Sequence, residues 1–169
     1  MNGNRKEHGF TLIELICAIV ILGIIGVGAG LGLTAFMKSW VITNENAGLS
    51  QKTQSAMARM RVELSHTRVT DFEIGSATQI KYTPIFSDEE TPKEHTISLA
   101  SQQRAVTLDN HTLADQVSGL EFKYFETFDG SAKSTVTPKT KLVQIKLTMT
   151  GTNNTPHIFI TRVKLASGS

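Results

Sequence analysis

An uncharged stretch near the N-terminus constrains this chain more than any other feature. Residues 15–37 read LICAIVILGIIGVGAGLGLTAFM and contain no Asp, Glu, Lys or Arg. As an α-helix rising ~1.5 Å per residue, the stretch covers about 34 Å, enough to cross a hydrocarbon core of ~30 Å. Arg5 and Lys6 precede it, which favours a cytoplasmic N-terminus and an exported C-terminal part. The sequence therefore predicts one membrane-spanning helix that carries an exported domain.

A cleaved signal peptide and a plain signal anchor are the simplest alternatives for this stretch. The apolar region of a signal peptide runs ~7–15 residues and ends at a small-residue cleavage site, whereas this stretch is longer and its end offers no such site. A signal anchor fits better but does not explain Glu14, because a carboxylate near lipid lowers the stability of an inserted helix. Thr11 and Glu14 also fit the capping-box pattern. Helix capping and a functional role for Glu14 both remain open.

The residues around the start of the apolar stretch resemble a known processing signal. Gly9 to Glu14 read GFTLIE, after a short leader with basic residues and before the uncharged run. This resembles the class III signal of type IV prepilins and pseudopilins. The resemblance implies cleavage after Gly9 by a prepilin peptidase, N-methylation of Phe10, and residence in the bacterial inner membrane before assembly into a fibre. Glu14 of an incoming subunit would then pair with the Phe10 ammonium of its neighbour, in a layer where an unpaired carboxylate is costly.

Glycines recur in the second half of the apolar stretch. Gly26-x-x-x-Gly30 has the small-residue spacing that lets two membrane helices approach closely. Each glycine also lowers helix propensity by ~1 kcal/mol, which would make this part easy to unwind. Glycine is common in membrane helices without any special role, so three interpretations stay open. The single cysteine, Cys17, excludes an intramolecular disulfide and is interpreted as a small apolar residue.

Beyond the apolar stretch the pattern predicts a continued helix and then an antiparallel sheet. Residues 38–70 contain no proline, and Met57, Met60 and Leu64 form an apolar stripe at helical spacing. Alternating apolar residues then predict short strands around 80–82, 97–99, 106–108, 120–124, 143–149 and 157–165. In the last strand Ile158 and Ile160 share one face, and the apolar face of the sheet is expected to pack on the helix stripe. The predicted fold class is α+β, a long N-terminal helix packed on an antiparallel β-sheet headpiece.

These patterns divide the chain into four segments. Residues 1–9 are the expected leader, 10–37 the transmembrane and assembly half of the helix, 38–70 its exported half, and 71–169 the globular headpiece. The run from Leu113 to Tyr124 (LADQVSGLEFKY) is similar to the minor pilins of the PilW type and to the J-type minor pseudopilins of type II secretion. Residues 58–64 (ARMRVEL) are similar to the helix ends of those proteins.

Nothing in the exported part indicates catalysis or a cofactor. Nucleophile elbows, phosphate-binding loops and metal-ligand spacings are missing from the sequence, and its five histidines are scattered. The acidic run at 88–90 lacks the alternating ligands of a calcium loop and is interpreted as solvated charge. A net charge of +2 indicates no nucleic-acid contact. We therefore expect no enzyme activity, no cofactor and no metal.

Two functions from different classes fit the sequence. The first is a minor pilin or pseudopilin that helps to initiate or cap a type IV pilus or a type II secretion pseudopilus, with other subunits and the prepilin peptidase/methyltransferase as partners. The second is a signal-anchored exported domain that binds a ligand or acts as an enzyme. The hexapeptide that begins at Gly9 and the position of Glu14 favour the first.

Overall fold

The computed structural model describes residues 10–85 and 93–166, so Gly9, the rest of the expected leader and the acidic run at 88–90 lie outside the described residues. The chain divides into two compact units, Met1–Asn44 and Glu45–Ser169. Helix α1 (Leu12–Ser65) begins in the first unit and ends in the second. The second unit, called the headpiece below, contains the last part of α1 and all of the strands.

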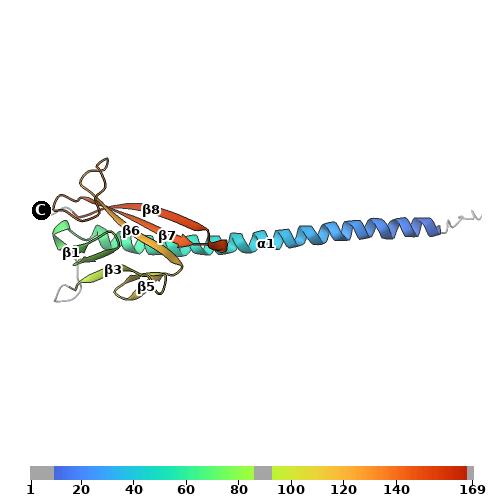
Figure 1. Cartoon of the computed structure of the whole chain (residues 1–169), viewed down its shortest axis with the longest axis horizontal. Helices are drawn as coiled ribbons and strands as arrows, with labels where there is room; N and C mark the ends of the chain where they lie inside the picture. Colours follow the sequence, from blue (N-terminus) through green and yellow to red (C-terminus); the bar gives the residue numbers. More distant parts are fainter. Residues whose placement is uncertain (1–9, 86–92, 167–169) are drawn as a thin grey trace, which may run out of the picture. The chain divides into compact units, whose positions relative to one another are not determined.

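Two antiparallel sheets make up the rest of the headpiece (Figure 1). One sheet has the order β1-β2-β3-β4-β5, and its strands are β1 (Phe72–Gly75), β2 (Gln79–Tyr82), β3 (His95–Ala100), β4 (Ala105–Leu108) and β5 (His111–Ala114). The other has the order β6-β7-β8, formed by β6 (Val117–Phe125), β7 (Leu142–Thr150) and β8 (Pro156–Lys164). The predicted α+β class, with a long apolar N-terminal helix and antiparallel sheets, is confirmed.

The helix ends at Ser65, earlier than the expected end near residue 70. The hydroxyl of Ser65 donates a hydrogen bond to the backbone oxygen of Val62, and the hydroxyl of Thr67 donates one to that of Glu63. Side-chain hydroxyls that bond to the last-turn carbonyls offer the backbone an alternative to another helical turn. A short 3-10 helix over Val69–Asp71 then leads into β1.

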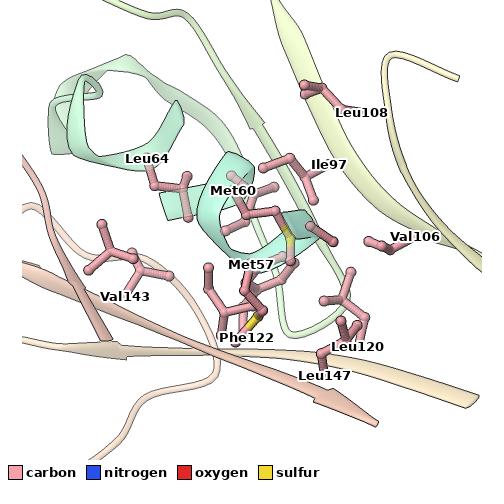
Figure 2. Close-up of a cluster of buried hydrophobic side chains, with 14 of the residues drawn as sticks. Met57, Met60, Leu64, Ile97, Val106, Leu108, Leu120, Phe122, Val143 and Leu147 are labelled. Atoms are coloured by element: carbon pink, nitrogen blue, oxygen red, sulfur yellow. The ribbon is translucent and has the colours of Figure 1, made fainter. Parts of the chain in front are cut away.

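The apolar stripe of α1 is buried against both sheets, as predicted. Met60 and Leu64 have no exposed surface, and Met57 is 9% exposed. Figure 2 shows these three side chains between strands of the two sheets. The labelled strand residues around them are Ile97, Val106, Leu108, Leu120, Phe122, Val143 and Leu147. One hydrophobic core therefore holds the helix and both sheets together, and it fixes the headpiece as a single unit.

The alternation predicted for β7 is confirmed, but the face predicted for β8 is wrong. Along β7 every second residue from Val143 to Met149 is buried. The register pairs Leu147 with Phe159 and Val143 with Val163, and residues directly opposite share a face of the sheet. The odd-numbered residues of β8 therefore face the core. Ile158 and Ile160, expected on the packed face, are 58% and 59% exposed.

Two tight turns of the headpiece are formed by residues suited to them. Asp109 and Asn110 have φ values of 51° and 66° and connect β4 to β5. Two consecutive positive φ values match a type I′ hairpin turn, for which Asp and Asn are suited. After β6, the Gly130 N–H bonds to the Thr127 oxygen at 3.2 Å, closing a turn that contains the Asp129-Gly130 pair.

Both tyrosines of the chain are buried, which makes their ionisation a test of headpiece packing. The Tyr82 hydroxyl donates to Glu63 Oε2 at 3.0 Å and that of Tyr124 to the Ser76 oxygen at 2.8 Å. Burial raises the pKa of Tyr124 above its usual value, and burial together with the Glu63 carboxylate raises the pKa of Tyr82. A folded-state pKa above the unfolded value means that the stabilisation is complete below about pH 10 and is lost as the pH rises further.

We expect the native protein to show no tyrosinate absorbance at about pH 11, where both tyrosines of the unfolded chain are mostly ionised. Each pH unit above about 10 lowers the free energy of unfolding by up to ~1.4 kcal/mol per buried tyrosine. The measurement is absorbance at the tyrosinate band against pH, with and without denaturant. Ionisation of both tyrosines near pH 10 in the native protein would contradict this packing.

Candidate functional site in the N-terminal half of the helix

The N-terminal half of α1 presents apolar side chains on all of its faces. Every residue from Phe10 to Asn44 is exposed. The helix is long and apolar enough to cross a membrane, and none of its most apolar stretch is buried within the chain. A helix that is apolar all round must be buried in lipid or against other chains. This surface is where contact with a membrane or with partner helices is to be sought.

Thr11 caps the first turn of α1, but Glu14 does not complete a capping box. The Thr11 hydroxyl accepts a hydrogen bond from the Glu14 N–H at 3.4 Å, and the Thr11 backbone oxygen accepts another from the same N–H at 3.1 Å. The reciprocal bond, from the Thr11 N–H to the Glu14 carboxylate, does not form. Within residues 10–85 and 93–166, that carboxylate has neither a hydrogen bond nor an ion pair. Capping therefore explains Thr11 but leaves the charge of Glu14 without a role inside the described chain.

Phe10 lies two residues before the first residue of α1 and is the most exposed large apolar residue of the chain that the structure describes, at 82%. One turn of helix separates it from Glu14, so both residues belong to the same end of α1. The structure brings Phe10 and Glu14 to one place, whereas Gly9 lies outside the described residues.

Gly26 and Gly30 have open space around them. A Cβ atom added to either glycine would meet no atom within 4 Å other than the helix's own backbone. No contact among the described residues requires a glycine there. A requirement for small residues at these positions, if there is one, must therefore come from another chain or from the flexibility of the helix.

The headpiece holds polar groups that act as structural links. The Arg59 guanidinium pairs with Glu63 at 2.6 Å, Glu63 accepts from the Tyr82 hydroxyl, and Arg61 donates to the Thr161 hydroxyl at 2.6 Å. The contacts of Glu63 and Arg61 connect α1 to one strand in each sheet. The described residues include no group of three or more His, Cys, Asp or Glu side chains that could hold a metal ion.

A polar hollow of about 360 Å³ lies beside the start of the helical part of the headpiece. Its lining includes Glu45, Lys52, Gln116 and Thr152. Lys52 pairs with Asp115 at 2.8 Å, and this hydrogen bond lowers the pKa of the Asp115 carboxyl below its usual value. Both side chains are about half exposed, so the pair contributes little to stability. The charged groups of the hollow already have partners within the chain, which gives no indication of a catalytic site.

The comparison with known protein families matches residues 4–30 to the prokaryotic N-terminal methylation motif. This motif is the N-terminal signal of type IV pilin-like proteins, and the match covers the N-terminal part of the chain only. The motif and the single apolar helix together fit a single-pass, membrane-anchored protein. A pilin-like N-terminus implies processing by a prepilin peptidase and assembly with other pilin-like subunits, and proteins of this kind are generally structural. The comparison with curated proteins gave no match.

The exposure of Ile158 and Ile160 on β8 could not be recognised from the sequence alone. β8 alternates these two isoleucines with a second set of residues that includes the apolar Phe159 and Val163. Both faces of β8 carry apolar residues, so only the register with β7 decides which face is buried in the core.

Proposed function

We propose that this pilin-like chain is a minor pilin or pseudopilin, a structural subunit that helps to initiate or cap a type IV pilus or a type II secretion pseudopilus. The observation that carries the proposal is the methylation motif at the start of a helix whose N-terminal half is apolar and exposed. The minor role is supported by the similarity of residues 113–124 to PilW-type minor pilins and J-type pseudopilins, which lies in β5 and β6 of the headpiece. The proposal includes the division of the chain into a leader (1–9), a transmembrane and assembly half of the helix (10–37), an exported half of the helix (38–70) and a globular headpiece (71–169).

Processing prepares the N-terminus for assembly. Cleavage after Gly9 by a prepilin peptidase in the bacterial inner membrane gives Phe10 a terminal ammonium, and N-methylation keeps its positive charge. Before assembly the leader is cytoplasmic and the headpiece exported, as the basic residues Arg5 and Lys6 favour. The mature chain then begins one residue before the capped first turn of α1.

Glu14 provides the pairing group for the neighbouring subunit. Its carboxylate is exposed and unpaired within the described chain, at the edge of a long apolar helix. Pairing with the Phe10 ammonium of a neighbour neutralises both charges in a low-dielectric layer. Because only one axial offset brings the two groups together, the pair sets the register of one subunit on the next.

Substitutions at Gly30 distinguish close helix packing from flexibility. Alanine adds a single methyl group but raises helix propensity by ~1 kcal/mol, whereas leucine adds bulk as well. If Gly26 and Gly30 form a packing face, Gly30→Leu lowers the amount of chain in fibres several-fold and Gly30→Ala has a small effect. The measurement is the ratio of chain in sheared fibres to chain in membranes. If both variants lose the same amount of chain from fibres, the glycines act through helix flexibility. If neither variant loses any, Gly30 is needed neither for close packing nor for flexibility.

The proposal predicts where the protein is found and what its deletion does. We expect to find small amounts of the chain in sheared fibres, and none there in cells that lack the prepilin peptidase. We also expect deletion of its gene to reduce the number of fibres. Separate deletion of the major subunits of a pilus and of a secretion pseudopilus identifies the fibre involved. A chain that stays in the membrane while fibre number is unchanged by its deletion would contradict the proposal, and would favour the anchored binding or enzymatic domain.

A further inference from the structure

Strand β8 has an open edge on the side away from β7. In the β7–β8 ladder, which has no register shift, the Leu165 N–H bonds to the Lys141 oxygen at 2.9 Å and the Gly151 N–H to the Thr155 oxygen at 2.8 Å. Bonded pairs alternate in an antiparallel ladder, so the odd-numbered residues of β8 bond to β7. The backbone N–H and C=O groups of Ile158, Ile160 and Arg162 therefore point away from β7, and none of them bonds to backbone elsewhere in residues 10–85 or 93–166.

The other sheet edges are short or guarded. The edge strands β1 and β5 have four residues each, and each pairs with its neighbour through a register shift. On the far edge of β6, the Phe122 N–H bonds to the Ala77 oxygen and that of Tyr124 to the Lys133 oxygen. In contrast, β8 has nine residues, no bulge, and a proline only at its first position, and the backbone bond on this side, from the Ala166 N–H to the Thr67 oxygen, lies beyond its last residue. Such edges pair readily with another chain, and most proteins protect them.

The side chains along this edge indicate what kind of segment fits it. Ile158 and Ile160 are exposed in the middle of the strand and are followed by Arg162 and Lys164 on the same face. Arg162 bonds to Gln144 and to the Phe128 oxygen and lies over the Phe125 ring, but neither it nor Lys164 forms an ion pair with any described residue. A complementary segment thus presents apolar residues opposite the isoleucines and carboxylates opposite the two cations.

The direction of β8 excludes a two-fold pair of identical β8 strands. Glu45 contacts Thr152 and Arg61 contacts Thr161, so β8 runs in the same direction as the helical part of the headpiece. Antiparallel pairing of two β8 strands would place the two Glu45 residues at opposite ends of the joint sheet. Two chains anchored through their N-termini in one membrane enter their headpieces from the same side. Parallel pairing would instead set Arg162 beside Arg162 and Lys164 beside Lys164, which is unfavourable.

We propose that β8 is a docking edge at which a different pilin-like subunit adds an extended segment antiparallel to β8, with acidic side chains opposite Arg162 and Lys164. This inference rests on the proposed function, because it takes its partner from the same fibre. Backbone hydrogen bonds along Ile158–Arg162 supply affinity, and the pattern of two apolar positions followed by carboxylates supplies selectivity.

The test is photo-crosslinking of the full-length chain in its own cells. The photoreactive residue p-benzoylphenylalanine replaces Ile160 at the edge or, as a matched control, the exposed Ser118 on the far strand of the same sheet. We expect an adduct from position 160 whose second component, identified by mass spectrometry, is another pilin-like protein joined through a segment that contains Asp or Glu. Position 118 should give at least about fivefold less. A charge reversal, Lys164→Glu, should lower the adduct several-fold, and Lys93→Glu, an exposed lysine outside β8, should not.

The outcomes separate this proposal from the proposed function. An adduct with a second copy of this chain, an adduct with a protein that is not pilin-like, equal yields at positions 160 and 118, or no adduct at 160 would each overturn the docking edge. The photoreactive residue at a third position, Ile19 in the apolar half of α1, reports fibre assembly independently of the β8 edge. If Ile19 crosslinks to pilin-like proteins and Ile160 does not, only the docking edge fails. If neither position does, the fibre role fails with it.

Discussion

Glu14→Gln is expected to remove almost all of the chain from fibres while leaving its amount in the membrane unchanged. Glutamine keeps the size of the side chain and is compatible with the Thr11 cap, which uses the Glu14 backbone N–H. It removes the charge that is proposed to pair with the Phe10 ammonium of a neighbour. Loss of one partner from a buried ion pair costs about 3–5 kcal/mol, so incorporation should fall more than about a hundredfold. Immunoblots of sheared fibres and of membranes measure the ratio.

Two variants control for general effects of this substitution. Glu14→Asp keeps the charge on a shorter side chain and should retain part of the activity. Glu45→Gln changes an exposed carboxylate in the headpiece part of the same helix and should assemble normally, because Glu45 bonds to a hydroxyl in its own chain. Normal assembly of Glu14→Gln would exclude the pairing hypothesis and leave Glu14 without an assembly role.

Phe122→Ala should destabilise the headpiece by about 3–5 kcal/mol, the usual range for truncation of a fully buried phenylalanine. Phe122 has no exposed surface and lies among the core residues that join α1 to β7 (Figure 2). Phe128→Ala is a matched control, because Phe128 is 66% exposed and its main contact is with Arg162; it should cost less than about 1 kcal/mol. Urea unfolding followed by near-ultraviolet circular dichroism measures both. Similar losses for the two variants would contradict the core described above.

The architecture could be predicted wherever a single period dominated the sequence. The uncharged run fixed the long helix, Met57, Met60 and Leu64 indicated its buried face, and the strict alternation from Val143 to Met149 identified β7. β1 and β5 were missed, and the pairing of β5 with β4 depends on the turn at Asp109 and Asn110. The orientation of β8 depends on which residues of β7 lie opposite, and this pairing is a long-range property that local pattern does not contain.

Part of the candidate site could likewise be predicted from the sequence, and part required the structure. The hexapeptide at residues 9–14 identified the processing signal from local sequence, and the family comparison agrees with it. Within the described residues, the structure adds that the Glu14 carboxylate lacks a partner, that no contact requires Gly26 or Gly30 to be glycine, and that β8 has an open edge. Each of these follows from what surrounds a residue in space.

The intact mass of the protein extracted from membranes tests the central claim most directly. The account predicts a chain that begins at Phe10 and carries one added methyl group, and a longer, unmodified chain in cells that lack the prepilin peptidase. A full-length, unmodified mass from cells with an active prepilin peptidase would contradict the account. The match at residues 4–30 would then be a coincidence of sequence, and the apolar helix would be no more than an anchor for the headpiece.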